Sequence, residues 1–292
     1  MKKVIKTVLS LVLVAVLSMV AVACGGGNAD DGVKGVKVKK FKGDAYHTVV
    51  NYVAEEDVTV LDLGKVNDDE ICIGRIQEGA FDGNQTIEEI IVPASVVEID
   101  EGAFKGMKNL KKITLPFVGA KVKADAYPNQ TPSAVDKAVD NERNFGYIFG
   151  SEEFEGGAKV ETTLGQNTVT YYIPSKLYQV NIIPSDDYVL PMYAFYGMTQ
   201  ITKVSLGEKV KYVGDYAFNG FSSLKEIEIS KDAKLEYIGE KAFVGTSIKS
   251  FSASVKIIKD YAFANVELEQ LQLADVESVG YGAFIGSEDL LD

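Results

Sequence analysis

Apolar residues recur along the chain in short alternating runs, and the runs repeat about every 20 to 25 residues. A typical unit contains an apolar triplet at L-x-x-I-x-L spacing, such as Leu224, Ile227 and Ile229. The last two members are two residues apart, so they point to the same side of a β-strand while their neighbours point to the other. A second apolar pair follows at V-x-x-I spacing, as in Leu235 and Ile238. The pattern predicts one short strand in each unit, with one face turned toward a core.

Seven Ala-Phe pairs mark the same point in successive units. Their rings belong to Phe81, Phe104, Phe195, Phe218, Phe243, Phe263 and Phe284. Successive rings are 23, 91, 23, 25, 20 and 21 residues apart. Such periods are typical of solenoids, in which each unit buries its apolar face only against its neighbours. We therefore predict a repeat solenoid, mainly β, in which the rings form a ladder with a step of about 5 Å.

The residue two positions after each of these phenylalanines is glycine in six units and Asn265 in the seventh. Asparagine is the residue that most readily replaces glycine where the backbone angle φ is positive. We therefore predict a left-handed turn residue at this position in every unit.

The combined pattern resembles the BspA-like class of leucine-rich repeats, whose units follow L-x-x-I-x-L-P-x-x-V-x-x-I-G-x-x-A-F-x-G. Residues 87–106 match it almost completely, including Pro93, and residues 224–245 match it with Gly239. The resemblance implies leucine-rich repeat coils in a curved stack, a binding role on the bacterial surface, and no catalytic residues.

The gap of 91 residues between two of the Ala-Phe pairs predicts an insertion at about 118–168. Midway in the gap, the run Gly-Tyr-Ile-Phe-Gly around Phe149 is similar to an insertion in BspA-like proteins, where one coil is stretched by loops. We expect polar loops at 118–144 and 151–168. Because a regular scaffold gains little from a long loop, we expect the first one to contact a partner.

The first 23 residues are predicted to be a lipoprotein signal peptide. Three lysines precede an apolar run from Val8 to Ala23, which is short for a transmembrane helix. The run ends Ala-Val-Ala-Cys-Gly and resembles a bacterial lipobox, which implies that Cys24 carries a lipid anchor to the membrane. The alternative is an ordinary cleaved signal with an incidental cysteine. Lipidation would leave Cys72 as a free thiol, so no intrachain disulfide is expected.

After the anchor we expect a flexible tether at 24–45, N-terminal cap strands at 46–70 and the solenoid at 71–292. The tether begins with three glycines and continues into a lysine cluster. The lysines either face an anionic envelope surface or protect the edge of a strand from pairing. Terminal units of solenoids are usually atypical, which explains why 46–70 departs from the repeat.

Composition excludes several kinds of function. The formal net charge of −12 argues against nucleic acid as a partner. The chain has one histidine, His47, and contains no G-x-S-x-G, Walker or CxxC motif, so we predict neither an enzyme nor a cofactor. The acidic runs at 68–70 and 186–187 lack the periodic oxygen ligands of calcium loops, so we predict no metal site.

Candidate binding residues are the neighbours of the inward-pointing residues in each strand. They point away from the core, so we expect them to line the concave face of the stack. The row is polar and of mixed sign, and a merely solvated sheet is the alternative. Its candidate members are Glu89, Ile91, Lys112, Thr114, Lys203, Ser205, Glu226 and Glu228. A second stripe contains Tyr212 and Tyr237, which either anchor an interface or pack coil on coil.

The sequence thus predicts a non-catalytic, membrane-anchored protein of the bacterial cell surface. By analogy with the resembling family, we expect adhesion or recognition of a protein or glycan ligand on host or neighbouring cells. The alternative is a structural scaffold or spacer of the envelope without a dedicated ligand. Acidic residues after Phe284 are expected to keep the last coil from pairing with another chain, so we expect a monomer.

Overall fold

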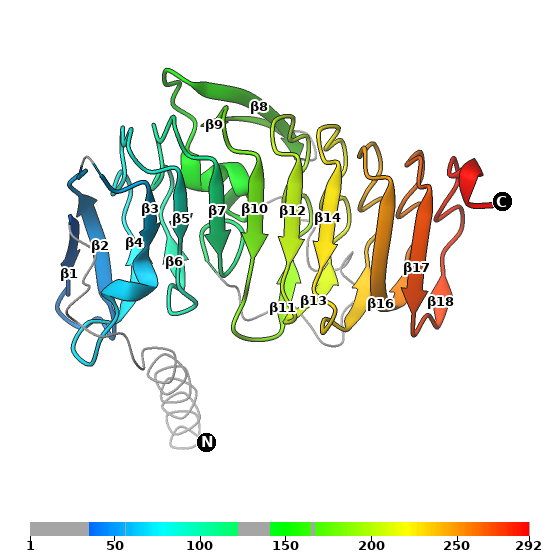
Figure 1. The fold of residues 1–292 in the computed structure, drawn as a ribbon, viewed down its shortest axis with the longest axis horizontal. Helices are drawn as coiled ribbons and strands as arrows, with labels where there is room; N and C mark the ends of the chain where they lie inside the picture. The colour runs from blue at the N-terminus through cyan, green and yellow to red at the C-terminus, as the bar shows by residue number, and fades with distance from the viewer. Residues whose placement is uncertain (1–34, 56, 122–140, 165–166, 292) are drawn as a thin grey trace, which may run out of the picture.

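The computed structural model describes residues 35–55, 57–121, 141–164 and 167–291. The chain winds into a stack of short coils that runs from β1 (Val36–Lys39) to β18 (Ser278–Val279) along the long axis of the molecule (Figure 1). Short strands on two sides of the stack bury the apolar positions of the repeat between them. The predicted mainly β repeat solenoid is confirmed.

The L-x-x-I-x-L triplets form a six-stranded parallel sheet. Its strands are β3 (Val60–Asp62), β5 (Glu89–Ile91), β7 (Lys112–Leu115), β10 (Gln179–Ile182), β12 (Lys203–Leu206) and β14 (Glu226–Ile229). Neighbouring strands pair residue for residue, so Val204 lies between Val180 and Ile227. Because each coil places an apolar residue at this point, the side chains form a continuous buried row.

The structure adds a second set of strands, formed largely by the V-x-x-I pairs. They are β4 (Ile73–Ile76), β6 (Glu98–Ile99), β11 (Tyr188–Leu190), β13 (Val210–Val213), β15 (Leu235–Ile238), β18 and the second half of β16 (Ser250–Ile258). Most coils therefore contain two strands. The repeat places each pair beside the same pair of the next coil, so backbone N–H and C=O groups find partners across the stack.

The rings of the Ala-Phe pairs stack from coil to coil, which confirms the predicted ladder. Consecutive ring centroids lie 4.8 to 5.3 Å apart on both sides of the insertion. The turns also bond to each other, since the N–H of Phe218 donates to the carbonyl oxygen of Ala242 at 2.8 Å. Ala242 is buried beside the rings, and its small side chain leaves them room.

Two rings keep the ladder continuous at the insertion. They belong to the 3-10 helix η4 (Phe145–Phe149). Phe149 lies 6.3 Å from Phe104, and Phe145 lies 5.0 Å from Phe195 on the other side. The backbone of η4 pairs with the turns of both neighbouring coils, so this segment replaces the Ala-Phe turn of one coil.

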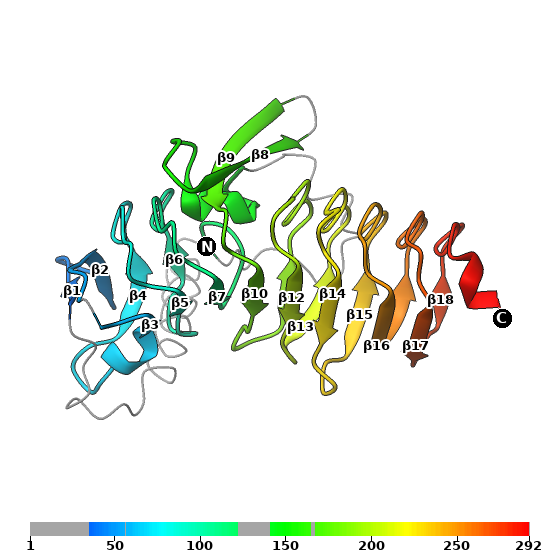
Figure 2. The same ribbon diagram turned by 45° about the horizontal axis from the view of Figure 1, so that its top comes forward.

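A β-hairpin occupies much of the region expected to be a polar loop. Strand β8 (Gly157–Leu164) pairs antiparallel with β9 (Asn167–Pro174), and Figure 2 shows the hairpin projecting from the stack. The predicted loop at 151–168 is therefore wrong. In β8, Val160 is buried and Glu161 is exposed, the alternation of a strand that covers other residues with one face only.

The other expected loop, at 118–144, is described only at its two ends. Val118 and Ala120 are buried, and the 3-10 helix η3 (Asn141–Arg143) precedes η4. The first residues of this region therefore belong to the packed stack and not to a polar loop. The partner contacts expected at its centre lie outside the described residues.

Strand β1 pairs antiparallel with β2 (His47–Tyr52) at the N-terminal end of the stack. The flexible tether predicted at 24–45 therefore does not extend through β1, and its first part, 24–34, lies outside the described residues. Lysines of β1 are exposed and alternate with half-buried valines, as on a strand edge that charge protects from pairing.

The region 46–70, where cap strands were expected, contains β2, β3 and the 3-10 helix η2 (Leu63–Val66). Strand β2 pairs with β4 and β3 pairs with β5, so these strands are the first parallel members of the two sheets. At the other end, the 3-10 helix η5 (Glu288–Leu291) follows the last coil.

The turn residue after each ladder phenylalanine has positive φ, as predicted. Asn265 has φ of 57°, in line with the glycines at the same position, whose φ ranges from 68° to 90°. At Gly106 the coils also approach closely, because an added Cβ would lie 2.8 Å from the backbone nitrogen of Gly83.

Unequal coil lengths break the first sheet after β14. Five residues connect β14 to β15, whereas β16 runs through nine residues without a turn. Strand β16 pairs with β15 and with β17 (Gln270–Ala274), and no ladder joins it to β14. The chain turns after Ile229 at the end of β14, whereas β16 continues straight on to Ile258. The two strands therefore take different directions and separate.

Candidate functional site

The outward side chains of the six-stranded sheet form one polar face, on which the predicted binding residues lie side by side in β5, β7, β12 and β14. Lys203 in β12 is at the centre of its most strongly charged part. Its Nζ atom donates to Glu228 at 2.7 Å and to Glu226 at 2.9 Å, and Ser205 donates to Glu228 at 3.0 Å. These charges thus compensate one another within the face.

The same contacts shift the protonation of both partners. Hydrogen bonds to Glu228 and then Glu226 raise the pKa of Lys203. The bond from Lys203 lowers the pKa of Glu228. Both side chains therefore remain charged at neutral pH, and a partner that displaces one must compensate the other.

Sequence reasoning omitted two polar residues of the face, Gln179 and Asn181 of β10. Gln179 donates to Asn181 at 3.0 Å, and Asn181 donates to Thr114 of β7 at 3.0 Å. They complete the row across the insertion. The signal was present, because Leu177, Val180 and Ile182 restore the triplet spacing there.

The N-terminal part of the face is less charged. Lys112 lies 3.9 Å from Glu89, and both side chains are about one-third exposed. Ile91 and Thr114 are half-buried in neighbouring strands. This part is a closed, continuous sheet and contains no break.

A groove of about 1230 Å³ opens on the polar face where β14 and β16 separate. Polar side chains at its rim include Ser205, Glu228 and Ser252, and Lys234 lies beside them. Apolar Ile229 and Leu273 also line it and are half-buried rather than fully covered. The groove therefore combines apolar surface with hydrogen-bonding groups, the composition typical of ligand sites.

Backbone groups also face this groove. Glu226 and Ser230 donate their N–H groups to β12, so Ile227 and Ile229 turn theirs toward β16. Because the ladder of the described sheet ends at β14, these groups are available to a bound molecule.

The structure places Tyr212 and Tyr237 next to each other in β13 and β15. Tyr237 is buried, and its hydroxyl donates to Oδ1 of Asp215 at 2.9 Å. Its ring therefore offers a partner little surface. Tyr212 is half-buried.

Asp215 is a buried carboxylate beneath the turn of its coil. Its Oδ1 atom accepts from Tyr237 and, at 2.7 Å, from the backbone N–H of Glu240. Burial raises the pKa of this carboxyl above its ordinary value of 3.8, and the charge of Glu240 adds to the shift. Between 3.8 and the raised pKa the folded protein binds more protons than the unfolded chain, so stability falls as pH rises through this window.

We expect Asp215→Asn to be more stable than the parent at pH 7, because Asn keeps the acceptor oxygen and removes the buried charge. The difference should shrink as pH falls toward 3.8, where the parent carboxyl is protonated. Denaturant titrations from pH 3.5 to 7.5 measure it. Asp260→Asn is the control, since Asp260 occupies the same position in a later coil and is exposed. A variant that is less stable than the parent at pH 7 would contradict the argument.

A row of four tyrosines and one lysine runs along the turns, and sequence reasoning missed it. We call it the tyrosine row, and it consists of Tyr193, Tyr216, Lys241, Tyr261 and Tyr281. Tyr193 stacks on Tyr216 at 5.2 Å, and Tyr261 meets Tyr281 edge to face at 5.5 Å. Lys241 lies between them, with Nζ 5.4 Å from the ring of Tyr216 and 5.8 Å from that of Tyr261. The sequence contains a signal for this row, because four of its members come directly before an Ala-Phe pair.

Four members of this row have a left-handed backbone, with φ between 51° and 58°. The equivalent positions Gly79, Gly102 and Gly282 have φ between 59° and 65°. A left-handed conformation costs a non-glycine residue about 1 to 2 kcal/mol, and an aromatic pair returns about 0.5 to 1.5 kcal/mol. Since these magnitudes are similar, stacking alone does not explain why the central coils avoid glycine here.

His47 and Cys72, which the sequence analysis also considered, lie next to each other. Nδ1 of His47 accepts from the N–H of Cys72 at 3.4 Å. The free thiol expected at Cys72 depends on lipidation of Cys24, which lies outside the described residues, so it stays a prediction. Within the described ranges, no group of three acidic, His or Cys side chains is placed to hold a metal ion. None of the helices described there is long and apolar enough to cross a membrane. The predicted signal peptide at 1–23 and Cys24 lie outside these ranges.

The repeat is similar to a known family over most of its length. A family model described as the BspA type leucine rich repeat region matches six copies, over residues 71–138 and 165–291. No curated protein sequence matches the chain.

Solved structures with the same kind of repeat are more distant. A leucine-rich repeat protein from Bacteroides ovatus is 19% identical, covers 89% of this chain and 93% of its own, and has a TM-score of 0.30. The leucine-rich repeat protein of T. pallidum is 15% identical, with 88% of each chain covered and a TM-score of 0.37. A leucine-rich cell surface protein from Faecalibacterium prausnitzii is 17% identical, with 88% of this chain and 52% of that one covered and a TM-score of 0.36.

Proposed function

We propose a non-catalytic binding function for this chain, which belongs to the family of BspA type leucine-rich repeat proteins. The ligand is a protein or glycan of a host cell, a neighbouring bacterium or the envelope. The chain acts at the bacterial surface, in adhesion or recognition. Family membership supports a repeat scaffold, and the groove at the end of the six-stranded sheet supports a ligand site.

One observation carries the proposal: the groove interrupts an otherwise regular sheet. A stack whose only role is to space two points gains stability from continuous pairing and gains nothing from a break in it. Here β14 and β16 part and leave both half-buried apolar side chains and backbone groups facing solvent. A ligand that covers this surface would remove the apolar side chains from water and bond to the backbone groups.

Filling the groove should weaken ligand binding. We expect Ser252→Trp, which places a large ring in the groove, to weaken binding by at least about tenfold while the fold persists. Glu89→Trp is the matched control, because it puts the same ring on the same face but in the unbroken part of the sheet. Surface plasmon resonance over purified matrix proteins, envelope polysaccharides and fixed bacteria measures both variants.

The result distinguishes a binding protein from a structural scaffold. If no component of the panel binds saturably, the scaffold interpretation replaces ours. If Glu89→Trp weakens binding as much as Ser252→Trp, the ligand covers the whole polar face and the groove is not its seat.

We also propose that Cys24 carries a lipid that attaches the protein to the membrane. The short apolar run that ends Ala-Val-Ala-Cys-Gly supports this proposal, because it resembles a bacterial lipobox with Cys24 at the lipidated position.

Labelling cells with a radioactive fatty acid and fractionating them tests the anchor. We expect Cys24→Ser to lose the label and to leave the membrane fraction, because the acceptor sulfur is gone. Cys72→Ser is the control and should keep both, because it changes the other cysteine and leaves Cys24 in place. A Cys24→Ser protein that remains labelled and membrane-bound would contradict the anchor.

A further inference from the structure

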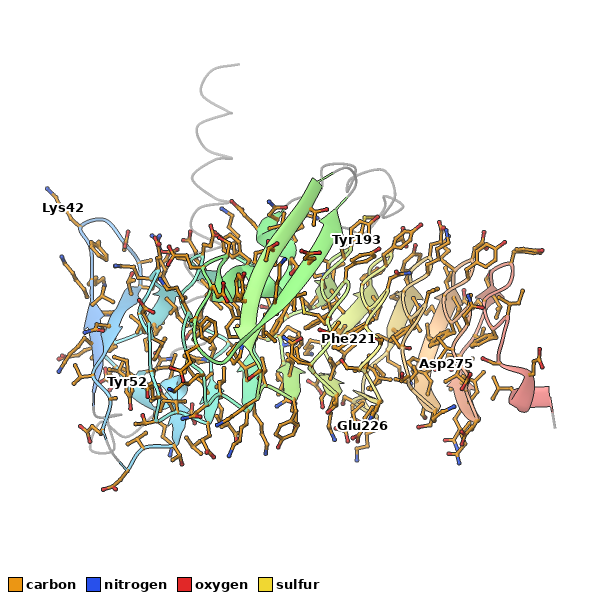
Figure 3. All side chains as sticks on the ribbon, turned by 90° about the horizontal axis from the view of Figure 1, so that it is seen from above. Lys42, Tyr52, Tyr193, Phe221, Glu226 and Asp275 are labelled. Atoms are coloured by element: carbon orange, nitrogen blue, oxygen red, sulfur yellow. The ribbon has the colours of Figure 1, made fainter. Side chains whose placement is uncertain are left out.

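The tyrosine row lies on the side of the stack opposite the polar face. Figure 3 shows Tyr193 and Glu226, one from each surface, on opposite sides of the molecule. A ligand in the groove and a ligand on the tyrosine row therefore do not compete for the same residues. The row is a separate surface.

The hairpin stands at the first end of the row. Oγ1 of Thr162 in β8 donates to the carbonyl oxygen of Tyr196 at 3.3 Å, and the ring of Tyr196 meets that of Tyr193 at 5.4 Å. An added Cβ on Gly197 would lie 3.2 Å from the backbone of Glu161. The insertion is thus fixed onto the turn where the row begins. Tyr281, near the other end, is 75% exposed.

The fold does not require side chains in this row. The first two coils and the last have glycine at the position before Ala-Phe, with the same left-handed backbone. Only the four coils that follow the insertion replace it with Tyr193, Tyr216, Lys241 and Tyr261. The substitution therefore coincides with the hairpin rather than with the repeat.

The row already holds one cation. The ammonium group of Lys241 lies over the faces of two tyrosine rings, and it pairs with Glu240 at 3.0 Å. Ring faces attract cations through their electron density. Carboxylates precede three row members in the sequence, at Asp215, Glu240 and Asp260. The exposed carboxylate of Asp260 and the half-buried one of Glu240 therefore favour positive charge beside the rings, and the net charge of −12 adds to this preference.

We propose that the tyrosine row is a second binding site, which takes an extended, arginine- or lysine-rich peptide segment of a partner protein. Such a segment lies along the turns, with guanidinium or ammonium groups against the ring of Tyr281 and the carboxylates of Asp260 and Glu240. Arginine fits best, because its planar group both stacks on rings and bonds to carboxylates. A neutral glycan would gain nothing from the charge of these carboxylates.

Removing two tyrosine rings tests the site without changing net charge. Tyr261→Gly introduces the residue that other coils carry at this position, and Tyr281→Ala removes an exposed ring, so the fold should survive. The probe is a fluorescein-labelled peptide of nine arginines, with nine glutamates and a neutral chitin hexasaccharide as comparisons. We expect saturable binding of the arginine peptide and a loss of about tenfold in affinity in the double variant. Tyr178→Ala, an exposed tyrosine outside the row, should bind as the parent does.

Each other outcome overturns the proposal. Equal affinity of the double variant would mean that the peptide binds through net charge alone. Binding of the hexasaccharide that depends on the row would assign the row to glycans. Circular dichroism of each variant verifies the fold, and Ser252→Trp should leave peptide binding unchanged, so failure of the groove and failure of the row are distinguishable.

Discussion

Phe218→Ala is expected to lower the free energy of unfolding by about 3 to 5 kcal/mol. The ring is fully buried in the middle of the ladder. Its centroid lies 5.3 Å from that of Phe195 and 5.0 Å from that of Phe243, and the planes of the first pair differ by only 3°. Truncation leaves a cavity that neighbouring coils cannot fill, because their own rings are held by the same stacking. Urea denaturation followed by circular dichroism measures the loss.

The loss should spread to adjacent coils, since each coil is stabilised mainly by its neighbours. Native-state hydrogen exchange should therefore show faster exchange in β12 to β15 than in β4 to β7. Phe41→Ala is the control, because Phe41 is 39% exposed and lies outside the ladder. A midpoint for Phe218→Ala equal to that of this control would disprove the ladder's contribution to stability.

Gly239→Ala should also destabilise strongly, by about 1 to 3 kcal/mol, although it adds a single methyl group. That carbon would lie 2.5 Å from the backbone nitrogen of Asp215 and 2.6 Å from the carbonyl carbon of Gly214. Both belong to the preceding coil, and backbone cannot rotate away as a side chain can. The coils must therefore move apart, which weakens the hydrogen bonds between turns.

Lys259→Ala is the matched control, because Lys259 occupies the same position in the next coil and already carries a side chain. It loses only a cation–π contact with Tyr237 at 5.4 Å, worth about 0.5 to 1 kcal/mol. Thermal unfolding of both variants is the measurement. A Gly239→Ala protein as stable as Lys259→Ala would show that the coils tolerate a wider separation.

The features predicted from sequence are those that the period itself encodes. Seven Ala-Phe pairs fix the ladder, because a ring repeated at one position of a stack has another ring as its neighbour. Asn265 in place of glycine identifies the left-handed turn, because few other residues adopt it. The outward row follows from the two-residue period of a strand.

The features that sequence reasoning missed depend on how one coil meets the next. The second strand of each coil exists because adjacent V-x-x-I pairs align, which a single unit does not reveal. The break after β14 comes from a long coil followed by a short one, a difference of spacing visible only as 25 and 20 residues. The hairpin was mistaken for a loop because its strands mix polar and apolar residues, as Val160 and Glu161 illustrate.

The tyrosine row was missed for a different reason. Tyrosine before Ala-Phe has no evident meaning in a repeat pattern, and its left-handed backbone appears only in three dimensions. Comparison of the units shows glycine in three of them at this position, which signals a turn that side chains normally avoid.

Hydrogen–deuterium exchange of the protein with and without the component that binds it most tightly in the resonance panel tests the binding function most directly. The N–H groups of Ile227 and Ile229 face the groove in the free protein. We predict that the ligand slows exchange there and in the first half of β16, while β5 and β7 exchange at unchanged rates. Protection confined to β5 and β7, or none in β14 and β16, would contradict a binding site at the break in the sheet.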